Sequence, residues 1–279
     1  MVVQGLGSGL LLVGTLVCLS GAGCSDGPVD TGGSGATRAT SAGARGGGGP
    51  EPWPWLATYE SPGCSNPDIT CTTFTDERDG KVYRSVTIAS QTWMGSALNY
   101  GEFSAEPVEA SPGFVPKQCP FDDLSWCDRA GAEYRWSVAM DLPTRCEEED
   151  CDELISAPHR GICPTGWHMP TLDEVSTLLD GVRGDDEECT GMPLKSTQGW
   201  TYGGEDDPAT DASGLSVLPQ EMSPNAGTVW AVRAGIWTAE SNSGRFRLLS
   251  LSVGAPCAYV DEVISSNGWR RYTVRCVAD

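Results

Sequence analysis

The chain has 279 residues, and 38 acidic against 18 basic side chains give it a formal net charge of −20. This surplus of carboxylates argues against nucleic acid as a partner, because phosphate binding requires clustered lysine and arginine. It also disfavours adsorption to anionic lipid. An apolar content of 39% with ten tryptophans is enough for a core, and the length suits one large domain or two small ones.

The first 23 residues are typical of an export signal. Leu10–Leu19 is an apolar run of signal-sequence length that is too short to span a bilayer. The small residues Gly21–Gly23 then lead to Cys24, in the manner of a bacterial lipobox, and this predicts a lipid anchor on Cys24. The alternative is an ordinary secretory signal cleaved near Ala22, with Cys24 unmodified.

A tether is expected over residues 24–63. Ser25–Pro50 consists almost entirely of Gly, Ser, Ala, Thr and Pro, a composition that cannot bury a core and behaves as a flexible coil. Ser25, at the second position of the mature chain, lacks the aspartate that holds lipoproteins at the inner membrane. We therefore expect an exported protein anchored in the outer membrane, on its periplasmic or cell-surface side, with a folded domain over residues 64–279.

The first predicted elements follow the turn at Asp79-Gly80. Val82–Ile88 alternates along its length, which predicts a strand. A cysteine-bearing, Pro-rich insertion occupies about 102–127, and Tyr134–Leu142 is a short helix candidate.

The clearest helix begins at Thr171. Thr171 is the expected N-cap, and Glu174, three residues on, completes a capping box. Apolar side chains then recur on one face of an amphipathic helix: Leu172, Val175, Leu178, Leu179 and Val182. His168, just before it, is expected to be a hydrogen-bonded turn residue.

Three strands are predicted near the end of the chain. Gly235–Ser241 and Arg245–Val253 are expected in one sheet, and a last strand places Tyr272, Val274 and Cys276 on one side. Two short helices among short strands indicate an α+β fold, with the helices outside a twisted antiparallel sheet.

Ten cysteines outside the signal and the anchor position predict up to five disulfides in an exported chain. Zinc is the alternative, but there is no CxxC and only two histidines, so a closed zinc site is disfavoured. Close spacing suggests the local bridges Cys64–Cys71, Cys119–Cys127 and Cys146–Cys151. This leaves Cys163–Cys276 and Cys189–Cys257 as long-range pairs, although spacing alone does not determine connectivity.

Seven segments occur in a fixed order: DGKVYRSVTIASQTWMGSALNY, YRWSVAM, GICPTGWHMPTLDEVSTLL, LKSTQGW, DASGLSVLPQ, GIWTAES and RYTVRCVAD. In this order they resemble the Fibrobacter succinogenes major paralogous domain over about residues 74–279, with insertions at 102–132 and 143–158. The resemblance implies an exported, often lipid-anchored bacterial protein. It also implies a disulfide-stapled fold similar to C-type lectins and formylglycine-generating enzymes, but no reaction.

No catalytic activity is predicted. Formylglycine-generating enzymes use two nearby cysteines upstream of the last strand, whereas Thr238–Val260 contains only Cys257. A serine hydrolase would be expected to carry a GxSxG elbow, which the chain lacks. The carboxylates of Asp173 and Glu174 are explained by the start of the helix.

Binding is the predicted role. A Gly-flanked acidic loop offers oxygen ligands for calcium, although a solvated loop explains the same residues: Glu205, Asp206, Asp207 and Asp211. Trp269, beside Arg270 at an expected hairpin tip, is a candidate for stacking on a sugar, whereas Trp200 and Trp237 are expected in the core.

The prediction is therefore a surface binding or adhesion module, for a glycan or for a protein partner in the envelope. A structural envelope protein without a ligand site is the alternative, and a secreted hydrolase is the second alternative.

Overall fold

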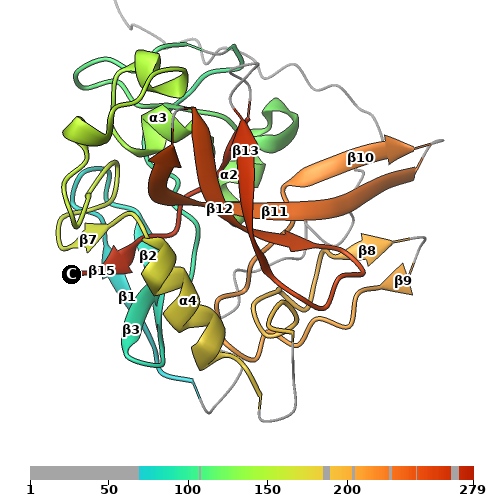
Figure 1. Cartoon of the computed structure of the whole chain (residues 1–279). Helices are drawn as coiled ribbons and strands as arrows, with labels where there is room; N and C mark the ends of the chain where they lie inside the picture. Colours follow the sequence, from blue (N-terminus) through green and yellow to red (C-terminus); the bar gives the residue numbers. More distant parts are fainter. Residues whose placement is uncertain are drawn as a thin grey trace, which may run out of the picture. The chain divides into compact units, whose positions relative to one another are not determined.

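Strands dominate the part of the chain that the computed structural model describes (Figure 1). The described residues are 69–106, 108–184, 189–202, 205–225, 228–242, 244–264 and 270–279. All of them belong to the unit Gly48–Asp279. The unit Met1–Gly47, and with it the predicted signal and Cys24, lies outside the described residues. No described helix is long and apolar enough to cross a membrane.

The smaller sheet has five antiparallel strands. Their order is β1-β2-β3-β15-β7, with bounds β1 (Cys71–Thr75), β2 (Val82–Ile88), β3 (Gln91–Met94), β15 (Val277–Ala278) and β7 (Trp167–His168). The predicted strand over residues 82–88 is confirmed as β2.

The larger sheet has eight strands. Its main path runs β13-β12-β11-β14-β6, with bounds β13 (Tyr259–Ile264), β12 (Arg245–Ser252), β11 (Thr228–Asn242), β14 (Tyr272–Thr273) and β6 (Glu133–Tyr134). The strands β8 (Thr201–Tyr202), β9 (Glu205–Asp206) and β10 (Glu221–Asn225) extend it beside β11. A separate parallel pair joins β4 (Glu102–Phe103) to β5 (Pro116–Lys117).

The α+β class and the antiparallel pairing of most strands are confirmed, but the strands are divided between two main sheets where one was expected. Tyr272–Cys276 was expected to be one strand. Instead, β14 pairs in parallel with β11 in the larger sheet, and β15 pairs in the smaller one. Val274 and Cys276, both fully buried, lie where the chain crosses between the sheets. The apolar side chains of this crossing are buried, as they would be in one continuous strand. Alternation of apolar residues in the sequence therefore does not distinguish a crossing from a strand.

Within the described residues, three α-helices accompany the sheets: α2 (Leu124–Ala130), α3 (Trp136–Ala139) and α4 (Leu172–Gly181). Three 3-10 turns are also found there: η1 (Pro120–Asp122), η2 (Thr144–Glu147) and η3 (Asp152–Leu154). The capping box of α4 is confirmed, since Thr171 Oγ1 accepts a hydrogen bond from the Glu174 backbone and Glu174 Oε2 accepts one from the Thr171 backbone. Val175 and Leu178 bury the apolar face of α4 in a core cluster that includes residues of β2, β3 and β11.

The helix in the Pro-rich insertion, α2, was not predicted. It is short, and its N-cap is Asp123, whose side chain accepts a hydrogen bond from Ser125 N. The helix expected over 134–142 is only α3, because Tyr134 pairs with Tyr272 in the larger sheet.

Four disulfides staple the described part of the chain: Cys119–Cys127, Cys146–Cys151, Cys163–Cys276 and Cys189–Cys257. Cys71 is also disulfide-bonded, and Cys64 lies outside the described residues. The Cys163–Cys276 bridge spans 113 residues and ties the loop before α4 to the crossing between the sheets. By chain entropy, a loop of this length contributes about 4–5 kcal/mol to stability.

Candidate functional site

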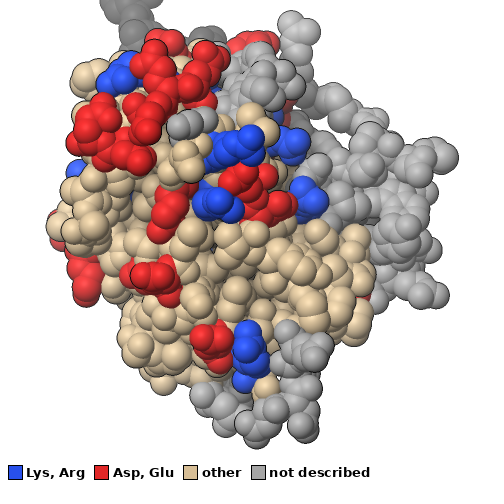
Figure 2. Space-filling view, in the orientation of Figure 1, with Lys and Arg blue, Asp and Glu red and all other residues tan. Residues whose placement is uncertain are grey.

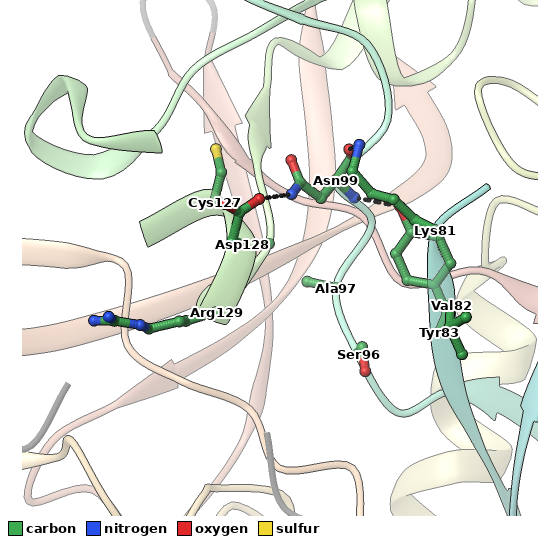
Figure 3. Close-up of a pocket in the computed structure, with 10 residues that line it drawn as sticks. Lys81, Val82, Tyr83, Ser96, Ala97, Asn99, Cys127, Asp128 and Arg129 are labelled. Atoms are coloured by element: carbon green, nitrogen blue, oxygen red, sulfur yellow. Dashed lines mark hydrogen bonds between the residues drawn. The ribbon is translucent and has the colours of Figure 1, made fainter. Parts of the chain in front are cut away.

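Two hollows in the described surface share one wall, the segment Asn99-Tyr100. The Asn99 pocket has a volume of about 240 Å³ and is lined by polar side chains that include Lys81, Asn99 and Asp128 (Figure 3). The Tyr100 hollow is larger, about 560 Å³.

The turn between β1 and β2 supports this wall. Asp76 and Lys81 close the turn through a backbone hydrogen bond of 2.8 Å, and Gly80 adopts a φ of 73° that a side chain would disfavour. Arg78 then lies over the Tyr100 ring, 3.8 Å from its centre, and Lys81 Nζ donates to the Asn99 carbonyl oxygen at 2.7 Å. A single turn therefore positions one cation against each wall residue.

Arg78 is held rigidly at the edge of the Tyr100 hollow. Its Nε and Nη2 bind the buried carboxylate of Asp76, and its Nη1 donates to the Ile162 carbonyl oxygen at 2.9 Å. Burial alone would raise the pKa of Asp76, but the hydrogen bonds and charge of Arg78 outweigh it and lower that pKa. The charge of Arg78 is thus neutralised within the protein.

Two other charged groups at the Tyr100 hollow are not neutralised in this way. Asp141 and Arg160 both line it and are exposed, and neither side chain has a hydrogen bond or ion pair within the described residues. Leu142 and Ile162 add apolar surface. An acceptor, a donor, an aromatic ring and apolar walls in a volume of this size are typical of a small-molecule or saccharide site.

The Asn99 pocket is built around an amide with fixed orientation. Asn99 Nδ2 donates to Asp128 Oδ1 at 3.1 Å, and Asn99 Oδ1 accepts from Lys117 Nζ at 2.6 Å. The Asn99 backbone oxygen accepts from both Lys117 Nζ (3.1 Å) and Lys81 Nζ (2.7 Å). Burial of Lys117, reinforced by the Lys81 charge, lowers the pKa of Lys117 to about 8.

The two histidines contact structural groups. His168 Nδ1 and Nε2 each lie 2.8 Å from a carboxylate oxygen, of Asp279 and Glu174 respectively. Burial alone would lower the pKa of His168, but the hydrogen bonds to these carboxylates raise it. His159 Nε2 lies 2.7 Å from the Met140 carbonyl oxygen.

Two of the four predicted calcium ligands have hydrogen-bond partners within the protein. Asp207 Oδ2 accepts from the buried ammonium of Lys195 at 2.8 Å, and Asp211 accepts from the backbone and hydroxyl of Ser216. Glu205 and Asp206 lie in β9, and their side chains are not among those described. No group of three or more potential metal ligands occurs among the described residues.

The tryptophan predictions fall into two groups. Trp200 and Trp237 are buried in the core, as expected. Trp269 lies outside the described residues, and Arg270, just before β14, is exposed.

The surface charges on the face drawn in Figure 2 are mixed. Acidic side chains gather near α3, whereas the arginines over β12 and β13 are paired with carboxylates. Arg245 and Arg247 each contact Glu262 at 2.7 Å.

Sequence reasoning did not single out the residues of the two hollows. Lys117 lies in the Pro-rich insertion, and Asn99 lies 18 residues earlier, so no local spacing links them. Arg160 and Asp141 lie at the edges of the insertion 143–158. The one usable clue was the predicted turn at Asp79-Gly80, because Lys81 lies between it and the predicted strand Val82–Ile88.

Residues 86–278 match the family described as the Fibrobacter succinogenes major domain. The chain belongs to this family. The match confirms the resemblance carried by the seven segments, and it includes Asn99, Lys117 and Asp128 while starting after the turn that carries Arg78. No curated protein and no solved structure matches the chain.

Proposed function

We propose that this protein is a cell-surface lipoprotein whose folded domain is a non-catalytic binding module, and that it binds a glycan in the Tyr100 hollow. The observation that carries the proposal is the combination, in one hollow of about 560 Å³, of an aromatic ring with a carboxylate and a guanidinium that have no partner among the described residues.

A sugar matches this combination of groups. Its hydroxyls both donate and accept hydrogen bonds, so Asp141 would accept from one hydroxyl and Arg160 would donate to another. Its C–H faces are apolar and would lie against Tyr100, Leu142 and Ile162. A few polar groups beside an apolar surface are what give such a site its specificity.

Export and anchoring are supported by two observations. The disulfides favour a compartment outside the cytoplasm, because they persist in oxidising environments. Family membership favours a surface-associated bacterial domain. Together with the predicted lipobox at Cys24, they favour anchoring in the outer membrane.

A C-type-lectin-like fold is part of the proposal. In its favour, β15 lies between β3 and β7 in the smaller sheet, and Cys276, just before β15, is bridged to the segment that leads into α4. The non-catalytic role is supported by the histidine contacts with carboxylates and carbonyls. It is also supported by the cysteines, because every described cysteine is disulfide-bonded.

The test is retention on a glycan array by the detergent-solubilised protein, compared with Arg160→Ala and Asp141→Asn. Both side chains are exposed, so the variants should fold as the wild type does. We expect each to lose at least about tenfold in affinity, equivalent to about 1.4 kcal/mol. Chelation of calcium should leave retention unchanged, because Asp207 and Asp211 already have protein partners.

Arg183→Ala is the matched control, since it removes an exposed arginine at the end of α4, far along the chain from the hollow. Retention of no glycan would favour the structural envelope protein. Equal retention by wild type, Arg160→Ala and Asp141→Asn would place the binding site elsewhere.

A further inference from the structure

Three side chains from separate segments meet at the Asn99 pocket: Asn99 and Asp128 line it, and Lys117 is buried beside Asn99. Asn99 follows β3, Lys117 ends β5, and Asp128 lies in α2. The Asn99 amide lies between the other two, with its oxygen 2.6 Å from the Lys117 amine and its nitrogen 3.1 Å from the Asp128 carboxylate (Figure 3 draws the second contact). Asn99 is 5% exposed and Lys117 is 6% exposed, so water is largely excluded from the pair.

This arrangement has the parts needed for an amide exchange. A neutral lysine amine is a nucleophile, and a primary amide is an acceptor whose leaving group is ammonia. The amine nitrogen already contacts Oδ1, and the carbonyl carbon is only about 1.2 Å from that oxygen. A carboxylate on the opposite side of the amide, next to the leaving nitrogen, is placed to move a proton.

We propose that Lys117 and Asn99 become joined by an intramolecular isopeptide bond, with Asp128 as the proton carrier. The Lys117 nitrogen attacks Asn99 Cγ, and the carbonyl electrons move to Oδ1. Asp128 accepts one proton from the attacking nitrogen and delivers it to Nδ2. The Cγ–Nδ2 bond then breaks, ammonia leaves and the carbonyl re-forms. One amine and one primary amide thus give one secondary amide and one ammonia, and no other reactant is needed.

The surrounding scaffold holds the three groups in place. The Cys119–Cys127 disulfide lies two residues after Lys117 and one before Asp128, so it links their segments directly. Beside Asn99, the Leu98 backbone is hydrogen-bonded on both sides, donating to Val274 O and accepting from Ala132 N. Such positioning of a nucleophile and its target is what raises intramolecular reaction rates.

The charge state of Lys117 agrees with this geometry. Burial and the Lys81 charge lower the pKa of Lys117 to about 8, so a substantial neutral fraction exists at mildly alkaline pH. Of the two oxygens of Asn99, Lys81 binds only the backbone one. The Lys81 ammonium also donates to the Asp79 carboxylate at 2.8 Å. Lys117 is therefore the amine assigned to the bond.

The test is mass spectrometry of the purified, folded full chain after reduction and alkylation. The wild type should be lighter than its sequence by one ammonia, and tryptic digestion should give a branched peptide that joins the Asn99 segment to the Lys117 segment. Fragmentation of that peptide matters, because cyclisation of another asparagine also releases ammonia. A wild type of full mass, with Lys117 recovered as an ordinary cleavage site, would overturn the proposal.

Variants separate the roles of the three groups. Lys117→Met should have its full calculated mass, whereas Lys81→Met is the matched control and should still lose ammonia. A branched peptide at Asn99 that persists in Lys117→Met would refute the assignment of the bond to Lys117. Asp128→Ala alters an exposed residue, and its newly folded chain should crosslink at least about tenfold more slowly than the wild type. An unchanged rate would show that Asp128 carries no proton.

Discussion

Two lysines are buried in this domain, and their surroundings differ. Lys195 is fully buried, and its ammonium donates to Asp207 Oδ2 and to the carbonyl oxygens of Ser252 and Ala255 at 2.7–2.9 Å. The Trp200 ring lies 4.9 Å away. Lys117 is almost as buried, yet its hydrogen-bond acceptors are the two oxygens of Asn99. After burial, the largest effect on its pKa comes from the charge of another lysine, Lys81.

The difference shows that burial alone does not determine the role of a lysine. With a carboxylate and two carbonyls, all three ammonium protons of Lys195 are satisfied, and the residue stabilises the loop that holds Asp207. Among the described residues, Lys117 has no carboxylate as a hydrogen-bond partner and lies beside an amide. Its pKa is lowered, so its amine loses its charge more readily. Groups of the second kind are typical of functional sites.

The largest expected effect comes from breaking the Lys195–Asp207 pair. Asp207→Ala leaves an ammonium buried without a counter-charge, and we expect a loss of about 3–5 kcal/mol in the free energy of unfolding. Urea denaturation at neutral pH measures it.

The control replaces both partners by apolar side chains. Lys195→Met/Asp207→Leu should recover most of the loss, because buried pairs replaced by apolar residues of similar volume are often neutral in stability. A double variant as unstable as Asp207→Ala would mean that packing of the loop, rather than charge, is what the pair provides.

The second prediction concerns the pH dependence at Lys117. Because its pKa is lowered to about 8, the neutral amine increases as pH rises and levels off above that value. Ammonia release from freshly refolded chain should therefore accelerate about tenfold per pH unit below the pKa and become constant above it. Time-resolved mass spectrometry follows the reaction. A rate that is the same on both sides of the pKa would contradict attack by a neutral amine.

The smallest effect on stability is expected at His168, a buried imidazole that contacts two carboxylates. Its folded-state pKa is raised, so its ionic contribution is fully present below about pH 6.5 and is lost as pH rises through the folded pKa. His168→Gln should cost on the order of 1 kcal/mol in mild acid and less at alkaline pH. Urea midpoints at the two pH values give the comparison, and an equal cost at both would show that the ring acts through packing alone.

The sequence predicted the elements whose determinants are local. The capping box at Thr171 and Glu174, and the alternation in Val82–Ile88, are contained within one helix and one strand, and both were found where expected. The last strand was predicted incorrectly because Tyr272–Ala278 pairs with strands from two different sheets, and the identity of these partners is not encoded in the segment itself.

The site residues were harder to predict for the same reason. Asp207 was grouped with its acidic neighbours in sequence, whereas in the fold it binds Lys195, twelve residues earlier. Asn99, Lys117 and Asp128 have no motif spacing in common, and only the fold of the insertion brings them together. The disulfide partners Cys119 and Cys127 were predictable because they are close in sequence.

The crossing of Tyr272–Ala278 between the two sheets has a consequence for biosynthesis. Strand β14 lies between β11 and β6, and β15 lies between β3 and β7, so neither sheet is complete until these residues exist. They are made after all the strands that they join. A chain emerging in order from the ribosome, or from an export channel, therefore carries two open sheets with unpaired edges until its last strands arrive. Both sheets can therefore close only after the last residues of the chain have been made.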